Sequence, residues 1–160
     1  MKEYLKILEL RGWAISFRKQ RIQKLKLTLS DTHGVEHWDR VYGNGKRLLE
    51  PGVDDMVVSA FAYTHDLWRN ADGQDLEHGP RAAEELPQYR NKLSFLNDEE
   101  FELLREACRL HTVSDATDNP TLNVCFDADR LDIGRVGIIP DPEKMCTPKG
   151  KILAQTAPSH

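Results

Sequence analysis

The polar pair His65 and Asp66 stands at the end of an apolar run, in the stretch AFAYTHDLW at residues 60–68. Burying an unpaired carboxylate is strongly unfavourable, so a buried carboxylate is normally paired or bound to a metal ion. Imidazole and carboxylate together suit zinc, manganese, iron or nickel, without a sharp choice among them. Successive residues of a helix point about 100° apart, so both side chains could lean toward a metal ion at the edge between them. Further ligands must then come from other helices.

Two other segments offer residues of the same kinds, namely HWDRV, which begins with His37, and DADRLD, which contains Asp127, Asp129 and Asp132. The second segment is flanked by apolar residues, LNVCF before it and IGRVG after it. Its three aspartates cover two sides of a helix, so at least one of them should be buried. Surface ion pairs with Arg130 and Arg135 would account for Asp127 or Asp132, but they explain all three aspartates less well.

The apolar residues recur with a helical period along most of the chain, and no strand hairpin or internal repeat is present. We expect helices at residues 2–10, 18–29, 35–50, 53–67, 76–86, 98–112 and 121–134. Ser30 or Asp31 is a suitable N-cap for the third of these, and Asn97 or Asp98 for the sixth. Gly43 and Gly45 each lower helix propensity by about 1 kcal/mol, but they could allow close contact between helices. The sequence therefore predicts an all-α domain of six or seven helices.

The length of 160 residues suggests one domain with a real core. Its expected parts are an N-terminal helical segment at 1–29, a core at 30–135, and a proline-containing tail at 136–160 packed on the same domain. The net charge of −4 argues against a surface built as a whole for nucleic acid. No apolar run approaches the roughly 20 residues of a membrane span, and residues 1–13 lack the apolar centre of a signal peptide. The three cysteines are far apart and fit free thiols in a reducing compartment, so we expect a cytoplasmic protein.

Three motifs occur in a fixed order: HWDRV at 37–41, HD at 65–66 and DADRLD at 127–132. This order resembles the HD-domain superfamily of metal-dependent phosphohydrolases, whose members carry the pattern H…HD…D on an all-helical bundle. The resemblance covers residues 30–135, and the longer phrase HGVEHWDRVYGNG is similar to a branch of small bacterial HD proteins. It implies four metal ligands, His37, His65, Asp66 and Asp129, since Asp129 rather than Asp127 has the typical A-D-R-L context. It also implies that Asp127 and Asp132 orient those ligands.

Two further histidines, His78 in EHGPRAA and His111 in RLHT, resemble positions where some HD proteins bind a second metal ion. Either they bind that ion, or they form hydrogen bonds with bound water or a phosphate. We interpret His33 as a capping or substrate-side residue. The phrase HDLWRN has Arg69 and Asn70 where guanosine-tetraphosphate hydrolases of the superfamily carry an acidic pair, which counts against that substrate.

The resemblance implies hydrolysis of a phosphoester in a small metabolite or nucleotide by a metal-activated water. The expected cofactor is one divalent ion per chain, or two: manganese, nickel, zinc, iron or magnesium. One alternative is a di-iron oxygenase, since some HD proteins oxidise their substrates. Another is a non-catalytic module that binds nucleic acid or another anionic partner through the basic segment RKQRIQKLK at 18–26, although such segments are more often solvated helix faces. The sequence leaves the oligomeric state open.

Overall fold

The structure is a computed structural model that describes residues 2–156, and within this range it contains seven α-helices and no β-strand. The α-helices are α1 (Lys2–Leu25), α2 (Val35–Leu48), α3 (Asp55–Thr64), α4 (His78–Glu85), α5 (Asp98–Leu110), α6 (Pro120–Arg130) and α7 (Pro148–Thr156). Four short 3-10 segments join them: η1 (Asp31–His33), η2 (Leu86–Leu93), η3 (Ile133–Val136) and η4 (Pro142–Lys144). The predicted all-α class is confirmed. Residues 157–160 of the predicted tail lie outside the described part of the chain.

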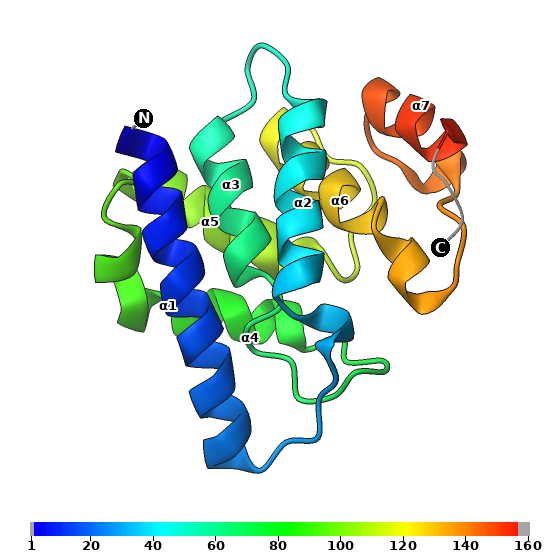
Figure 1. Cartoon of the computed structure of the whole chain (residues 1–160). Helices are drawn as coiled ribbons and strands as arrows, with labels where there is room; N and C mark the ends of the chain where they lie inside the picture. The colour runs from blue at the N-terminus through cyan, green and yellow to red at the C-terminus, as the bar shows by residue number, and fades with distance from the viewer. Residues whose placement is uncertain (1, 157–160) are drawn as a thin grey trace.

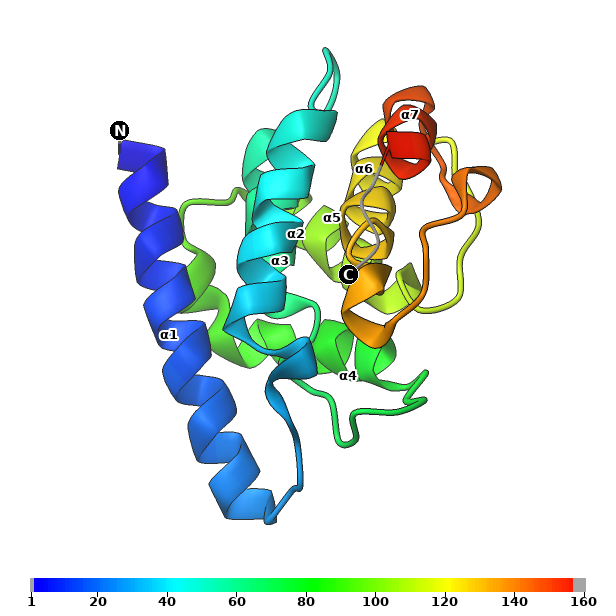
Figure 2. The same cartoon turned by 45° about the vertical axis from the view of Figure 1, so that its right-hand side comes forward.

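The antiparallel pair α2 and α3 forms the centre of the bundle (Figure 1). Helix α1 packs along α3 on one side, and α6 packs against α2 and α3 on the other. Helices α4 and α5 pack against each other and close the bundle behind and below α3, while α7 lies beside α6 on the face remote from α1 (Figure 2). Within the described residues, no helix is both long enough and apolar enough to cross a membrane.

The short loop at residues 49–54 makes α2 and α3 antiparallel and so brings the start of one helix to the end of the other. His37 lies eleven residues before the end of α2, and His65 lies ten residues after the start of α3. At about 1.5 Å per residue, both lie roughly 15 Å from the loop. Helix α6 begins beside the start of α3, where the Asp54 amide donates to Thr121 Oγ1 at 2.9 Å. Its last turn therefore reaches the same end of the bundle.

Helix α1 is one continuous helix of 24 residues, whereas the apolar pattern predicted two separate helical segments. It buries Ile7, Leu10 and Ala14 against the bundle. A bidentate ion pair fixes its position on α2, since Arg11 donates from Nε and Nη2 to the two carboxylate oxygens of Asp39, each at 2.9 Å.

The predicted caps are placed as expected at one helix and differently at another. Asn97 forms a full capping box with Glu100 at the start of α5. Ser30 caps the 3-10 segment η1, while α2 itself begins after Gly34 without a side-chain cap. Helix α4 ends at Glu85, close to the predicted end at residue 86, and the chain continues directly into the 3-10 segment η2.

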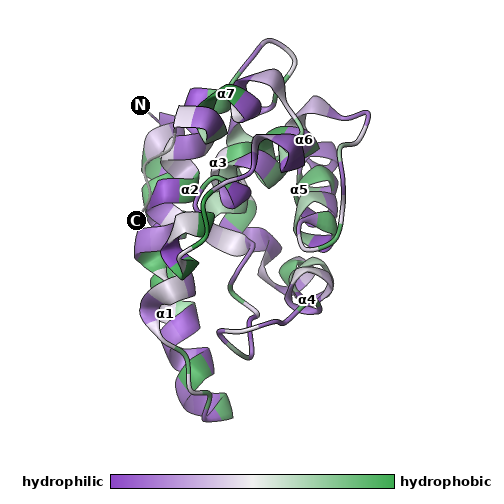
Figure 3. Ribbon diagram, turned by 90° about the vertical axis from the view of Figure 1, so that its right-hand side faces the viewer, coloured by the Kyte–Doolittle hydropathy of each residue, from purple (hydrophilic) through white to green (hydrophobic). Residues whose placement is uncertain are grey.

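Helix α7 was not predicted from the sequence. It is short, and only Gly150 and Ala154 are buried in it, so it has no strong apolar period. Pro148 starts this helix, a position where the missing amide proton of proline costs nothing. The outer helices of the bundle carry both hydrophilic and hydrophobic residues along their length (Figure 3). Helix α3 differs from them, because all residues from Val57 to Thr64 are buried.

Two glycines of α2 have different surroundings although they are only two positions apart. A Cβ atom at Gly45 would lie 2.6 Å from Cγ1 of Val58 on α3, closer than real side chains approach. A Cβ atom at Gly43 would have no neighbour within 4 Å. Gly45 is therefore required by the close packing of α2 on α3, and Gly43 is not.

We expect Gly45→Ala to lower the free energy of unfolding by about 1–3 kcal/mol, because the stiff, buried Val58 must shift to admit the methyl group. Gly43→Ala is the matched control and should raise it by up to about 1 kcal/mol, since alanine favours the helix. Urea denaturation of both variants measures the difference. Equal effects of the two substitutions would contradict the packing described here.

Candidate metal centre

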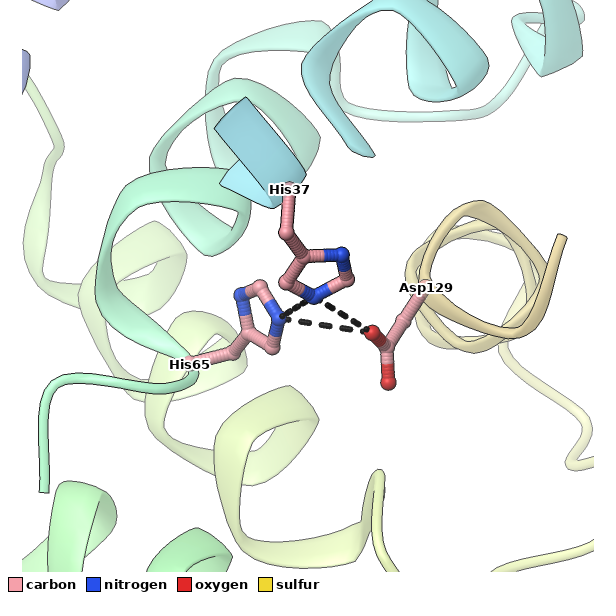
Figure 4. Close-up of side chains that lie close together, drawn as sticks. All are labelled: His37, His65 and Asp129. Carbon is pink, nitrogen blue, oxygen red and sulfur yellow. Dashed lines mark hydrogen bonds and ion pairs between the residues drawn. The ribbon is translucent and has the colours of Figure 1, made fainter. Parts of the chain in front are cut away.

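Three helices bring histidine and aspartate side chains to one point at the end of the bundle. His37 lies in the first turn of α2, and His65 is the residue that caps the end of α3. Asp66 follows His65 directly, and Asp129 lies in the last turn of α6. The side chains of His37, His65 and Asp129 point toward one another (Figure 4). The structure thus brings together the four residues that the resemblance implied as ligands.

Four atoms of these residues surround one position. His37 Nε2 lies 3.2 Å from each of three atoms: His65 Nε2, Asp66 Oδ2 and Asp129 Oδ1. His65 Nε2 lies 3.3 Å from Asp66 Oδ2 and 3.4 Å from Asp129 Oδ1. Two nitrogen and two oxygen donors at such spacing match the chemistry of a first-row divalent cation.

The two carboxylate oxygens that face this position have no hydrogen-bond donor. Asp66 Oδ2 and Asp129 Oδ1 are both buried and unpartnered among the described residues. A buried polar atom without a partner costs about 1–3 kcal/mol, and more when the group is charged. A metal ion held between these oxygens and the two imidazole nitrogens would remove that cost, so the residues present fit a cation.

The hydrogen bonds of the two imidazole rings also favour metal binding. His37 Nδ1 lies 2.7 Å from Asp132 Oδ2, and His65 Nδ1 lies 2.9 Å from the carbonyl oxygen of Phe61. These acceptors place the ring proton on Nδ1 in both histidines. The Nε2 lone pairs are then free to point at the shared position, as in the carboxylate–histidine–metal arrangements of known metal sites.

A second group of donors adjoins the first and shares Asp66. His78 Nε2 lies 3.0 Å from Asp66 Oδ1, the other oxygen of that carboxylate, and 3.0 Å from His111 Nε2. His78 begins α4 and His111 caps α5, and both side chains are buried. These three residues can also hold a metal ion. Asp66 thus lies between two metal-binding groups, with one oxygen facing each.

The second group is oriented in the same way as the first. His78 Nδ1 lies 2.5 Å from the carbonyl oxygen of Asp75, and His111 Nδ1 lies 2.6 Å from that of Cys108. The close approach of α4 to α5 depends on Gly79, where a Cβ atom would lie 2.5 Å from the Cys108 oxygen. This contact brings His78 within reach of His111.

In the first group, the carboxylates raise the pKa values of the two histidines. Burial by itself would lower the pKa of His37, but the nearby carboxylates of Asp129, Asp132 and Asp66 raise it to about 10. Burial also opposes the charge on His65, and the two nearby carboxylates raise its pKa to about 9. Protons therefore occupy this group in the absence of a cation, and a metal ion must displace them, so metal affinity should rise with pH. His111 differs, because burial lowers its pKa to about 3 and leaves the ring neutral.

The two aspartates predicted to orient the ligands have different positions. Asp132 lies against His37, as that role requires, and Arg40 Nε donates to its second oxygen at 2.7 Å. Asp127 is not brought to the cluster, although it is fully buried. Its carboxylate accepts hydrogen bonds from the amides of Cys146 and Thr147 at 2.7 and 2.8 Å. Asp127 thus anchors the segment that leads into α7, a role that the sequence did not suggest.

A cavity of about 190 Å³ opens beside the two groups, with Asp66, Asp129, His78 and His111 in its lining. Arg69 and Arg135 also line it. Arg135 Nη2 lies 3.9 Å from Asp129 Oδ1, and Arg135 Nε is buried without a partner among residues 2–156. Sequence reasoning assigned neither arginine to the site. The position of Arg69, three residues after Asp66, was the available signal, since its Nε lies 3.3 Å from Asp66 Oδ1.

His33 borders the cluster without joining either group. Its Nδ1 lies 3.9 Å from Asp66 Oδ2 and 3.4 Å from Arg135 Nη2, while its Nε2 donates to the carbonyl oxygen of Asp72 at 2.8 Å. Burial lowers its pKa to about 4, so the ring is neutral and its Nδ1 accepts from the arginine. His33 therefore holds Arg135 at the edge of the cavity.

Comparison of the chain with protein-family models, with curated proteins and with solved structures finds no match. The chemistry of the site is accordingly inferred from its own geometry.

We expect Asp66→Ala to abolish metal binding, because this substitution removes a carboxylate oxygen from both groups. Glu36→Gln, an exposed change next to His37, is the control and should bind metal like the unaltered protein. Metal analysis after loading with Mn²⁺ or Zn²⁺ gives the content per chain. Thermal unfolding gives the stabilisation, about 2.7 kcal/mol at a metal concentration of 100 times Kd. Full metal content in Asp66→Ala would exclude the site.

A second pair of substitutions separates the roles of Asp132 and Asp127. Asp132→Asn should weaken metal binding about 10–100-fold, because His37 loses the negative charge that orients it. Asp127→Asn should leave metal affinity unchanged, yet lower the free energy of unfolding by about 1–3 kcal/mol, since its donors lose a charged acceptor. Isothermal titration calorimetry and urea denaturation measure the two effects. Equal loss of metal affinity in both variants would show that the assignment is wrong.

Proposed function

We propose that the protein is a metal-dependent phosphohydrolase of the HD-domain type, acting on a small phosphorylated metabolite or nucleotide. The observation that carries the proposal is the position of Asp66 between two groups of metal ligands beside a cavity with two arginines. Paired metal positions with nearby cationic side chains are typical of enzymes that hydrolyse phosphoesters. The order H…HD…D in the sequence supports the same assignment.

The four residues His37, His65, Asp66 and Asp129 would hold the first cation. When bound, such an ion polarises a phosphoryl oxygen and lowers the pKa of a coordinated water from 15.7 toward 7. His78 and His111, together with Asp66, would hold a second cation or accept hydrogen bonds from a bound water, because their Nδ1 atoms lie against carbonyl oxygens and leave Nε2 as the atom that faces the site. Asp132 keeps the ring proton of His37 on Nδ1, so that the Nε2 lone pair would be available to a bound cation.

The two arginines of the cavity bear on the charge of the substrate. A guanidinium group presents several N–H donors in a plane and matches the oxygens of a phosphate. The unpartnered Nε of Arg135 is one buried donor available for that purpose. Arg69 donates from Nη1 to the carbonyl oxygens of Ala71 and Gly73, at 3.1 and 3.0 Å, which holds the loop on that side of the cavity in place. The two side chains would orient an anionic group against the metal ligands.

The size of the cavity limits what can enter it. Its volume of about 190 Å³ is below the roughly 300–1,000 Å³ of pockets that enclose a whole small molecule. A phosphate group fits this space, while the remainder of a larger substrate would extend outside. This favours a terminal phosphomonoester over an internal phosphodiester. Free thiols at all three cysteines agree with the reducing, cytoplasmic location that we propose for the enzyme.

We expect the purified protein, loaded with Mn²⁺, Ni²⁺ or Zn²⁺, to release inorganic phosphate from at least one member of a panel of nucleoside monophosphates and sugar phosphates. Chelation should abolish the release, and so should Asp129→Ala, because both remove the cation. Glu36→Gln should retain full activity. Oxygen consumption with two irons per chain, and no phosphate release with any metal, would favour an oxygenase instead.

A further inference from the structure

A second cavity lies on the other side of the segment that carries Asp66 and Arg69. It has a volume of about 550 Å³, against about 190 Å³ for the cavity at the metal centre, and the two have no lining residue in common. Its walls are the second half of α1, the end of α4 with η2, and the residue Trp68. No residue of the candidate metal centre lines this cavity, so the two spaces are separate.

Four aromatic side chains line this cavity: Trp13, Phe17, Trp68 and Tyr89. The ring of Phe17 lies 5.1 Å from Trp13, 5.2 Å from Trp68 and 5.1 Å from Tyr89, measured between centroids. Trp13, Phe17 and Tyr89 are only partly buried, so part of each ring surface is exposed to solvent. The rings are tilted to one another, by 34° between Trp13 and Phe17 and by 73° between Phe17 and Tyr89, so the cluster offers both faces and edges to an aromatic ligand.

Three basic residues, Arg21, Lys24 and Arg81, lie at the same cavity, opposed by the single carboxylate of Glu85. Lys24 forms no ion pair with any described residue, and it belongs to the segment 18–26, which has no acidic residue. Arg21 donates to neutral acceptors, the carbonyl oxygen of Arg69 at 2.8 Å and Asn70 Oδ1 at 2.7 Å. This positive charge is local, because the chain as a whole carries a net charge of −4.

The electrostatic environment of Arg21 also favours negative charge in this cavity. Burial and the neighbouring charge of Arg81 lower the pKa of its guanidinium group. Arg81 is itself paired with Asp75, at 2.5 Å, and the carboxylates of Asp75 and Glu85 offset only part of the burial and charge repulsion that act on Arg21. A negatively charged ligand in the cavity would stabilise the protonated form of Arg21.

We propose that this cavity is a binding site for a planar aromatic ligand that carries an anionic group, the chemistry of a nucleoside phosphate. The base would stack on one ring of the cluster and meet the edges of the others, and the phosphate would face Lys24 and Arg21. The volume lies within the range of pockets that hold small molecules. Neither of the two groups of residues that could hold a metal ion lies at this cavity, so we assign ligand binding to it and no catalysis. The site is independent of the phosphohydrolase activity proposed above.

The three tryptophans of the chain provide separate reporters for the two cavities. Trp13 and Trp68 line the aromatic cavity, whereas the indole N–H of Trp38 donates to the carbonyl oxygen of His33 at 2.9 Å, next to the metal centre. Adenosine 5′-monophosphate is titrated into ¹⁵N-labelled protein in the presence of EDTA, which keeps cations from the metal centre. The indole signals of Trp13 and Trp68 should shift with saturation, and that of Trp38 should not. Adenosine alone and inorganic phosphate alone should each bind at least tenfold more weakly.

Two charge reversals on α1 form a matched pair. Lys24→Glu should weaken binding at least fivefold, and Lys19→Glu, an equal change of charge on an exposed residue outside the cavity, should have less than a twofold effect. The proposal fails if Trp13 and Trp68 do not shift, or if only Trp38 shifts. It also fails if the two lysine variants bind equally, or if the shifts follow protein concentration instead of nucleotide, which would indicate a second copy of the chain in the cavity.

Discussion

Two carboxylate oxygens, Asp66 Oδ2 and Asp129 Oδ1, are buried at one point without a hydrogen-bond donor among the described residues. An arrangement of this kind is costly unless a cation compensates it, because like charges repel and neither is solvated. In the absence of a cation, protons on His37 and His65 perform that role, as their raised pKa values show. The start of α2 and the ends of α3 and α6 lie at one level of the bundle, where their polar residues compensate one another.

The segment DADRLD illustrates how one short stretch of helix connects three parts of the molecule. Asp129 points to the metal centre, Asp132 holds His37 from behind, and Asp127 accepts hydrogen bonds from the residues before α7. Their separations of two and three residues turn them to different sides of the chain. The segment therefore connects the candidate metal centre, the orientation of His37 and the docking of helix α7.

Much of this organisation could be predicted from the amino-acid sequence, and the exceptions have physical reasons. The helical period and the Asn97 cap are local features, and the positions of His65 and Asp66 at the end of an apolar run predicted a buried polar site. The continuous helix α1 was missed because its middle, around Gly12, lacks a regular apolar pattern. The role of Asp127 was missed because its partners lie about twenty residues later in the chain, where no local signal marks them. The contribution of Arg135 depends on tertiary placement beside His33, which no sequence spacing encodes.

The anchoring of residues 146 and 147 by Asp127 has a consequence for the order of events when the chain is made. The carboxylate of Asp127, in helix α6, has these hydrogen-bond donors only after residues 146 and 147 have been made and have docked on α6. The partner of His37 is also distant in the sequence, since Asp132 follows it by 95 residues. Contacts so distant along the chain form late, because the loop between them must first close. The candidate metal centre therefore depends on contacts between segments that are far apart in the sequence, whereas the pairing of α2 with α3 joins neighbouring helices.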